Sequence, residues 1–342
     1  MKENTKADNK ARTQISDIGK VNLLDRLFAK SGYKNTETLN FKQEGKSYIY
    51  CSKLLLEGID FDLTYTPLKH LGYKATLFAI GSIYAKAYQP KGICFSMGLS
   101  ARFCVEDIEE LWSGILAATK EHNIEQVTLE LNSSITGLSI AASAIGEQDN
   151  AFVENIRSLD NTSLLCLSGN VGAAYMGLHV LEREKIAFNN ANKLNYKQSD
   201  LSKYKYILSQ YLSPNINPQS TKQFVEAQIY PSTGYFITKG LAYTIKQLCK
   251  ENNVGAKIYL SKIPIAAQTF EMAEELNMDA ITAALNGGDD YKILYIIPIN
   301  EHQRFHKEFP NVDIIGHLCK PEAGENLITP EGAEIELKAQ GW

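Results

Sequence analysis

The sequence predicts a mixed α/β protein of two domains, with an α+β first half and an α/β second half. Its 342 residues exceed the size at which a single hydrophobic core usually stops growing. Short apolar runs with the period of a strand alternate with segments whose apolar residues recur at helical spacing. Hydrophobic residues make up 44% of the chain, enough to form sizeable cores. We expect a disordered polar tail over residues 1–16, a first domain over 17–150 and a second domain over 151–342.

The first half shows the clearest periodicity. Val21, Leu24, Leu27 and Phe28 recur at helical spacing before Ser31, which predicts a short amphipathic helix. A dense apolar stretch with few glycines predicts a buried helix over 67–87. The other elements that we predict are strands at 48–52, 92–99, 127–131 and 138–145 and a helix at 105–122.

The second half opens with an apolar strand at 164–167, followed by a glycine-containing turn from Ser168 to Gly172 and a helix over 175–185. A turn of this kind can present backbone N–H groups to an anion such as phosphate. The same pattern joins strands to helices in α/β proteins without any ligand, so both interpretations stay open. Further elements that we predict are a helical patch at 204–212 inside a polar stretch, a strand at 293–297, a helix at 301–309 and a strand at 312–316.

Charge and cysteine usage exclude several functions. A net charge of -4 leaves no basic footprint for nucleic acid or an anionic membrane, so neither is expected as a partner. The six cysteines include no Cys-x-x-Cys pair, which favours reduced thiols in a cytoplasmic protein. His302 and His306 lie four residues apart, but no further ligand accompanies them, and a solvated helix face is the simpler interpretation. Neither a P-loop nor a Gly-x-Ser-x-Gly motif occurs.

Five segments, in one order along the chain, resemble the bacterial thiamine-monophosphate kinases. The longest runs from Leu54 to Ala75, and another is Asn286-Gly287-Gly288-Asp289-Asp290-Tyr291. This resemblance implies the two-domain fold shared with aminoimidazole ribonucleotide synthetase, in which the first domain pairs with a second copy through its sheet. We therefore expect a homodimer. The segments are 54–75, 132–138, 168–178, 284–291 and 335–342.

The family transfers the terminal phosphoryl group of ATP to thiamine monophosphate, and it uses Mg²⁺ to neutralise and align the two phosphates. Thiamine phosphate or a nucleotide is therefore the implied ligand. Asp60 stands where the family has a histidine that contacts substrate, and Trp342 matches an aromatic residue that stacks on thiamine. The implied substrate-binding positions are Asp60, Asp289, Asp290, Tyr291 and Trp342, and the degenerate nucleotide positions are Trp112, Glu130, Arg157 and Thr238.

The metal positions depart from the family pattern. Residues 40–47 contain no aspartate where the family has Gly-Asp-Asp, and the six implied metal positions retain one carboxylate, that of Glu130. A lysine can neutralise phosphate charge or simply face solvent, but it cannot supply the oxygen shell that Mg²⁺ requires. We therefore assign no catalytic residue, expect no cofactor, and favour a non-catalytic binding protein over an active kinase with altered metal use. The six positions are Ser52, Lys53, Ser82, Glu130, Phe236 and Lys239.

Overall fold

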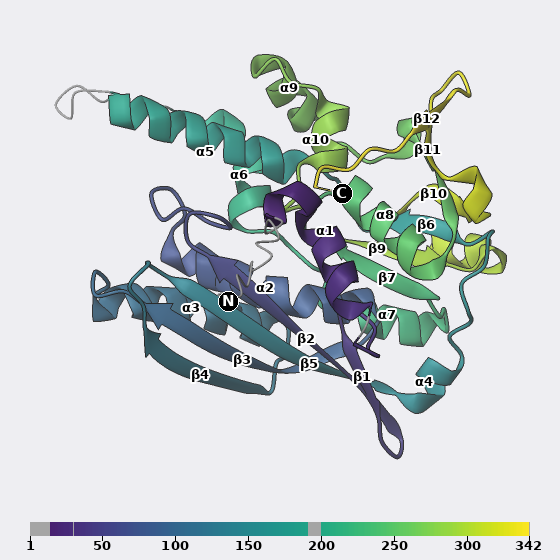
Figure 1. Ribbon diagram of the computed structural model, residues 1–342, viewed down its shortest axis with the longest axis horizontal. Coiled ribbons are helices and arrows are strands. Elements are labelled where there is room, and N and C mark those ends of the chain that lie inside the picture. Colours follow the sequence, from purple (N-terminus) through teal and green to yellow (C-terminus); the bar gives the residue numbers. More distant parts are fainter. Residues whose placement is uncertain (1–13, 30, 191–199, 342) are drawn as a thin grey trace, which may run out of the picture.

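Two sheets form the framework of the computed structural model, which describes residues 14–29, 31–190 and 200–341 (Figure 1). The first sheet has five strands in the order β1-β2-β5-β3-β4, and the second has seven in the order β12-β11-β8-β10-β6-β9-β7. All neighbours are antiparallel except β3 with β4 and β8 with β11. The strands are β1 (Leu39–Lys42), β2 (Lys46–Leu56), β3 (Gln89–Leu99), β4 (Gln126–Ser133), β5 (Ser139–Asp149), β6 (Leu164–Leu167), β7 (Thr233–Ile237), β8 (Gly255–Tyr259), β9 (Lys292–Ile297), β10 (Asp313–Cys319), β11 (Glu325–Ile328) and β12 (Glu334–Glu336).

The helices confirm the mixed α/β architecture that the sequence predicts. They are α1 (Ile15–Phe28), α2 (Leu68–Ala85), α3 (Val105–Glu121), α4 (Asn150–Glu154), α5 (Ala173–Asn190), α6 (Lys205–Leu212), α7 (Ser220–Ala227), α8 (Leu241–Asn252), α9 (Ala267–Glu275), α10 (Ala280–Asn286) and α11 (His302–Glu308), with short 3₁₀ turns η1 (Ser202–Tyr204), η2 (Leu260–Lys262), η3 (Ile299–Glu301) and η4 (Pro321–Ala323). Most of the predicted polar tail, residues 1–13, lies outside the described residues, and α1 begins at Ile15. The division into domains at residue 150 stays a prediction.

Helix α2 is the central element of the molecule. It packs against β2, β3 and β5 of the first sheet and against β7 and β9 of the second, so side chains around its whole circumference are buried. A Cβ at Gly72 would clash with the carbonyl oxygen of Leu111, and one at Gly114 with that of Lys69. These two glycines therefore allow α2 and α3 to approach closely. One hydrophobic cluster includes residues from both sheets, such as Ile49 and Tyr295.

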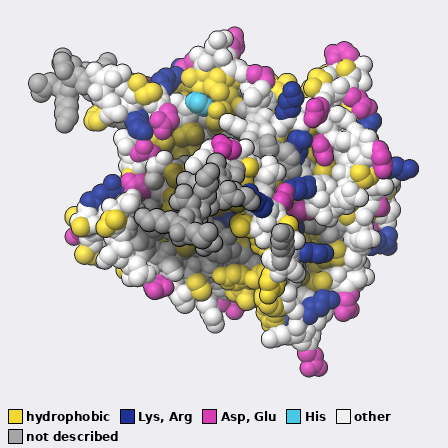
Figure 2. Space-filling view, in the orientation of Figure 1, with side chains coloured by type: hydrophobic (Ala, Val, Ile, Leu, Met, Phe, Trp, Pro, Cys, Tyr) yellow, Lys and Arg dark blue, Asp and Glu magenta, His cyan; other side chains and the backbone are white. Residues whose placement is uncertain are grey.

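The two faces of the first sheet differ. Helices α2 and α3 cover one face, while the other face carries exposed apolar side chains. Leu39, Phe41 and Leu54 on that open face are 54%, 56% and 55% exposed. Figure 2 shows hydrophobic side chains gathered over the part of the molecule where Figure 1 labels β1, β2 and β5. A long apolar strand face left in water is typical of a surface that another protein covers.

The described helices include none whose length and apolar character would let it cross a membrane. All six cysteines are free thiols.

Candidate functional site

The fold brings several of the implied site residues together around a small cavity between α2 and the second sheet. This inner cavity has a volume of about 100 Å³. Its wall includes four aromatic rings, those of Phe61, Phe78, Tyr211 and Tyr291. The positions implied by the family resemblance that line it are Asp60, Thr238, Lys239, Asp289 and Tyr291.

Lys74 of α2 occupies the centre of this arrangement. Its ammonium lies 2.9 Å from Asp289 Oδ2 and 3.9 Å from the ring centroid of Tyr211, and its side chain is only 7% exposed. The Tyr291 ring centroid is 5.5 Å away. A buried ammonium needs such partners because desolvation of an unpaired charge is costly. Lys74 was not among the residues implied by the sequence, although a lysine in the middle of a helix predicted to be buried is a usable signal.

The backbone around Asp289 holds that carboxylate in place. Asp289 adopts a left-handed conformation with φ of 56°, and its N–H donates to the carbonyl of Thr238 at 2.8 Å. The N–H of Tyr291 donates to Ile237 at 3.1 Å. The loop before β9 is therefore fixed to the end of β7, which brings Thr238 and Asp289 to the same wall.

A second ion pair, between Lys53 and Glu37, lies near the C-terminal end of α2, where Ser82 also contacts the carboxylate. Lys53 Nζ lies 2.5 Å from Glu37 Oε1, and Ser82 Oγ donates to the same oxygen at 2.7 Å. Burial opposes ionisation of Glu37, but the Lys53 ammonium and the hydrogen bonds from Lys53 and Ser82 outweigh it and hold the pKa of this carboxyl below its usual value. Glu37, which lies just before β1, was not among the implied residues, because the resemblance placed the missing aspartates at residues 40–47.

Phe236 fills the space beside this ion pair. Its ring packs so closely on Gly81 that a Cβ there would clash with it, and it meets the Tyr291 ring edge to face at 5.3 Å. An apolar ring thus stands where the resemblance implies a metal-binding aspartate. On the far side, Lys239 lies 4.9 Å from the ring centroid of Tyr243.

Glu130 and Ser52 lie on the other face of the first sheet. Strand register places Glu130 beside Ser96 and on the same side as Leu54, whereas Lys53 faces the helices. Glu130 accepts two long contacts, one of 3.5 Å from Ser96 Oγ and one of 3.4 Å from Asn132 Nδ2. Ser52 Oγ bonds instead to Ser143 Oγ at 2.8 Å.

These groups do not fit a magnesium ion. Lys53 and Lys239 are cations, Phe236 has no donor atom, the Ser82 hydroxyl donates to Glu37, and Glu130 lies across the sheet. Mg²⁺ requires a compact, near-octahedral set of oxygen ligands. Within residues 14–29, 31–190 and 200–341, no three His, Cys, Asp or Glu side chains are grouped so that they could hold a metal ion.

The turn that leads into α5 is occupied by the protein's own carboxylate. The Gly172 N–H donates to Asp290 Oδ1 at 2.7 Å, while Asp290 Oδ2 has no partner among the described residues. Asp290 is 3% exposed, and burial raises its pKa to about 8, although the Gly172 N–H and the nearby Lys292 ammonium oppose the rise. One of the backbone donors that could have met a phosphate is therefore already satisfied.

The remaining implied residues lie apart from the inner cavity. Trp112 is partly buried against the hydrophobic cluster shared by both sheets. Arg157 lines a separate cavity of about 250 Å³ together with Arg304. Trp342 lies outside the described residues. An outer cavity of about 820 Å³ adjoins the Lys53 ion pair, with Glu37 and Lys86 among its walls.

Comparison with known proteins agrees with this architecture. No family model matches the chain. The thiamine-monophosphate kinase of Aquifex aeolicus is 24% identical over 336 residues, which cover 96% of this chain and 99% of the relative. The structure of that kinase complexed with AMPPCP and TMP superposes with a TM-score of 0.79 at 20% identity, covering 96% of this chain and 98% of the other.

A hydrogenase maturation protein, E. coli HypE, shares the fold more distantly. Its TM-score is 0.62 at 13% identity, with 97% of this chain and 91% of that chain covered. The resemblance carried by the five sequence segments thus extends over nearly the whole length. The chain is therefore similar to thiamine-monophosphate kinases over nearly its whole length, and it shares the mixed α/β fold of these proteins, as the sequence resemblance predicts.

Proposed function

We propose that this protein is a thiamine-monophosphate kinase-like protein that no longer transfers phosphate and acts as a dimeric binding protein. The observation that carries the proposal is the ion pair between Lys53 and Glu37. At a position where the family resemblance implies a metal-binding aspartate, an ammonium group engages a carboxylate instead. Phosphoryl transfer between two polyanions depends on metal ions that neutralise charge and align the reacting groups.

The lysines cannot replace those ions. An ammonium is a point charge on a flexible stem, so it neutralises a phosphate without fixing the in-line geometry of transfer. It also repels any divalent cation placed beside it. Both Lys53 and Lys74 are in turn engaged by carboxylates of the same chain, which lowers their availability to a phosphate.

The size of the inner cavity supports the same proposal. About 100 Å³ is well below the roughly 300 Å³ at the lower end of small-molecule sites. A ligand as large as thiamine monophosphate would have to displace Lys74 or the Tyr211 ring. Any nucleotide or thiamine phosphate bound by this protein would more readily enter the outer cavity beside Glu37.

That outer cavity also favours a second candidate, an active kinase with altered metal use. Its volume of about 820 Å³ suits a nucleotide, and Glu37 on its wall is an ionised carboxylate. In such an enzyme Glu37 would leave Lys53 when a metal-bound nucleotide arrives.

An activity assay separates the two candidates. Purified protein incubated with ATP, thiamine monophosphate and Mg²⁺ should form no thiamine diphosphate above the background without protein, whereas an active family member assayed in parallel should. Replacing Lys53, Ser82 and Lys239 together by aspartate should not restore turnover. Phe236 would still occupy one implied ligand position, and Asp290 would still accept the Gly172 N–H that a phosphate could have used. Magnesium-dependent turnover that Glu37→Gln or Glu130→Ala abolishes would establish the active kinase instead.

The open face of the first sheet supports the homodimer. A second copy that covers Leu39, Phe41 and Leu54 would remove a large apolar surface from water. We expect a dimer in sedimentation equilibrium at micromolar concentration, and a monomer for the double variant Phe41→Asp, Leu54→Asp. Leu27→Asp is the control, because Leu27 is exposed on α1 and outside the sheet. A monomeric parent protein would contradict the proposal.

A further inference from the structure

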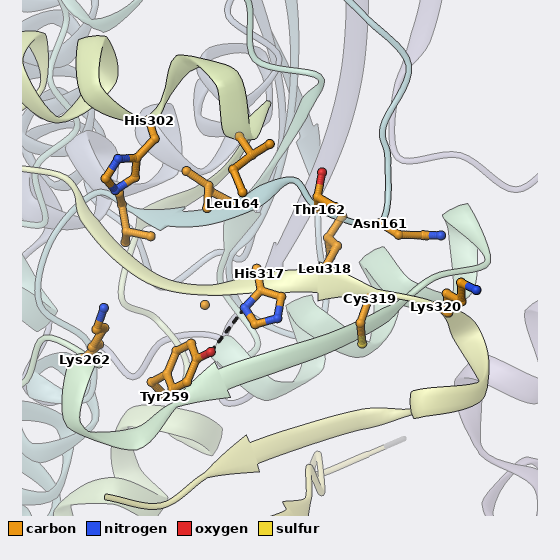
Figure 3. Close-up of a pocket in the computed structure, with 13 residues that line it drawn as sticks. Asn161, Thr162, Leu164, Tyr259, Lys262, His302, His317, Leu318, Cys319 and Lys320 are labelled. Atoms are coloured by element: carbon orange, nitrogen blue, oxygen red, sulfur yellow. Dashed lines mark hydrogen bonds between the residues drawn. The ribbon is translucent and has the colours of Figure 1, made fainter. Parts of the chain in front are cut away.

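Another pocket lies on the seven-stranded sheet, away from the inner cavity. Its floor is formed by β10 with the ends of β6 and β8, and its rim by η2 and the start of α11 (Figure 3). Its volume is about 650 Å³, within the range of small-molecule sites. No residue that lines it also lines the inner cavity, and none is a position implied by the family resemblance.

Basic groups distinguish this pocket, which we call the basic pocket. Lys262, His302, His317 and Lys320 line it, and its lining includes neither Asp nor Glu. The chain as a whole carries a net charge of -4, so an acid-free wall of this size is unusual for this protein. Among the described residues, neither Lys262 nor Lys320 forms an ion pair with a carboxylate, and both are exposed. The Lys262 ammonium lies 5.6 Å from the ring centroid of Tyr259, a contact that leaves its charge without a counter-ion, so an anionic ligand can still pair with either lysine.

The floor between the two lysines is apolar and aromatic. Leu164 and Leu318 are buried beneath it, and the half-buried rings of Tyr259 and His317 lie 5.8 Å apart. A long hydrogen bond of 3.5 Å joins Tyr259 Oη to His317 Nδ1 and helps to fix both rings (Figure 3). Burial and the neighbouring Lys257 lower the pKa of His317, so its ring is largely neutral at pH 7. The two rings are tilted by 35° to one another, and each can offer an aromatic face to the ring of a ligand.

We propose that the basic pocket binds a small aromatic anion, an aromatic carboxylate or an aryl phosphate. The ring of the ligand lies against Tyr259 and His317, and its acid group meets the ammonium of Lys262 or Lys320. A neutral ligand of the same shape gains the ring contact alone, and an organic cation is repelled. Charge and ring together set the selectivity of the site.

Calorimetric titration of the full chain tests this proposal with three probes of one shape: 2-naphthoate, 2-naphthyl phosphate and neutral 2-naphthamide. We expect at least one anion to bind about tenfold more tightly than the amide, and the tighter of the two identifies the acid group that the site prefers. The double variant Lys262→Met, Lys320→Met should remove that advantage while leaving amide binding unchanged. Tyr259→Leu should weaken all three probes.

Lys222→Met is the matched control, because Lys222 is exposed on α7 and does not line the pocket. Circular dichroism of each variant verifies that the fold is retained. Equal affinity for the anions and the amide, no binding of any probe at millimolar concentration, or anion binding that survives the double substitution would each overturn the proposal. None of these outcomes depends on kinase activity, so this test fails or succeeds independently of the proposed function.

Discussion

The inner cavity and the basic pocket are built from the same kinds of side chain, lysines and aromatic rings, but their lysines meet different groups. In the inner cavity the Lys74 ammonium lies on the Asp289 carboxylate and over the Tyr211 ring. In the basic pocket Lys262 and Lys320 have no carboxylate in the lining. The protein thus supplies its own counter-charge at one site and leaves it to a ligand at the other. The kinds of side chain alone therefore do not distinguish a ligand-binding site from a site whose charges are already paired within the protein.

Burial explains the difference. Lys74 is almost fully removed from water, so folding would be costly unless a carboxylate and aromatic faces replaced its hydration. Lys262 and Lys320 remain hydrated at the rim of their pocket. Hydrated ammonium groups carry no such requirement and can exchange water for an anion.

The largest expected contrast between the two sites is in packing. Phe236→Ala should destabilise the protein by about 3–4 kcal/mol, because it removes a buried ring that packs on Gly81 and Tyr291. Tyr259→Ala in the basic pocket should cost less than about 1 kcal/mol, because that ring is half exposed. Urea unfolding followed by circular dichroism measures both. Equal costs would mean that the packing behind the inner-cavity wall, where Phe236 contacts Tyr291, is no tighter than the packing of the basic pocket.

Substitutions in the Lys74–Asp289 ion pair should cause smaller losses of stability, and the loss should differ between the two partners. Asp289→Asn should cost about 2 kcal/mol, because it leaves a buried ammonium without its counter-charge while asparagine still tolerates the positive φ. Lys74→Met should change stability by less than about 1 kcal/mol, since an apolar side chain of similar length replaces the cation and Asp289 can reach water. The two variants are compared by urea unfolding at pH 7. A greater loss for Lys74→Met would show that the cation, rather than its burial, stabilises this region.

A further contrast is the pH dependence set by Asp290. Its folded pKa of about 8 lies above the unfolded value of 3.8, so the folded state binds the extra proton between these limits and stability falls as pH rises through this window. Each bound proton contributes a slope of about 1.4 kcal/mol per pH unit. Asp290→Asn should therefore lose less stability than the parent between pH 5 and pH 7.

Unfolding midpoints of the parent and Asp290→Asn at several pH values measure this difference. His317→Gln in the basic pocket is the comparison variant, and it should leave the downward slope in place. Parallel pH profiles for the parent and Asp290→Asn would contradict the burial of an uncharged Asp290.

The sequence predicted the elements whose signal is local. The strand at 164–167 and the helix at 67–87 match β6 and α2 closely because each is a dense apolar run. The sequence predicted no individual elements for β7, α8, β8, α9 and α10. From this region only the implied positions Phe236, Thr238 and Lys239 and the segment 284–291 entered the prediction.

The candidate site was harder to predict for a physical reason. Glu37 and Lys74 became recognisable as site residues only through their ion-pair partners. Glu37 pairs with Lys53, 16 residues away in the sequence, and Lys74 pairs with Asp289, 215 residues away. Sequence spacing does not indicate such pairs. Lys53 and Glu130 lie on opposite faces of the first sheet. This follows from the strand register, which cannot be read from the sequence without knowing how β2, β5, β3 and β4 pair.

The position of α2 between the two sheets has a consequence for how the molecule folds and moves. Because this helix contributes to a hydrophobic cluster that includes both sheets, neither half can complete its core without the other. The two halves should unfold in one cooperative transition, and a fragment that ends near residue 150 should expose the side of α2 that β7 and β9 normally cover. Rigid hinge opening would require this shared core to break. Entry into the inner cavity would therefore depend on movements of side chains and loops.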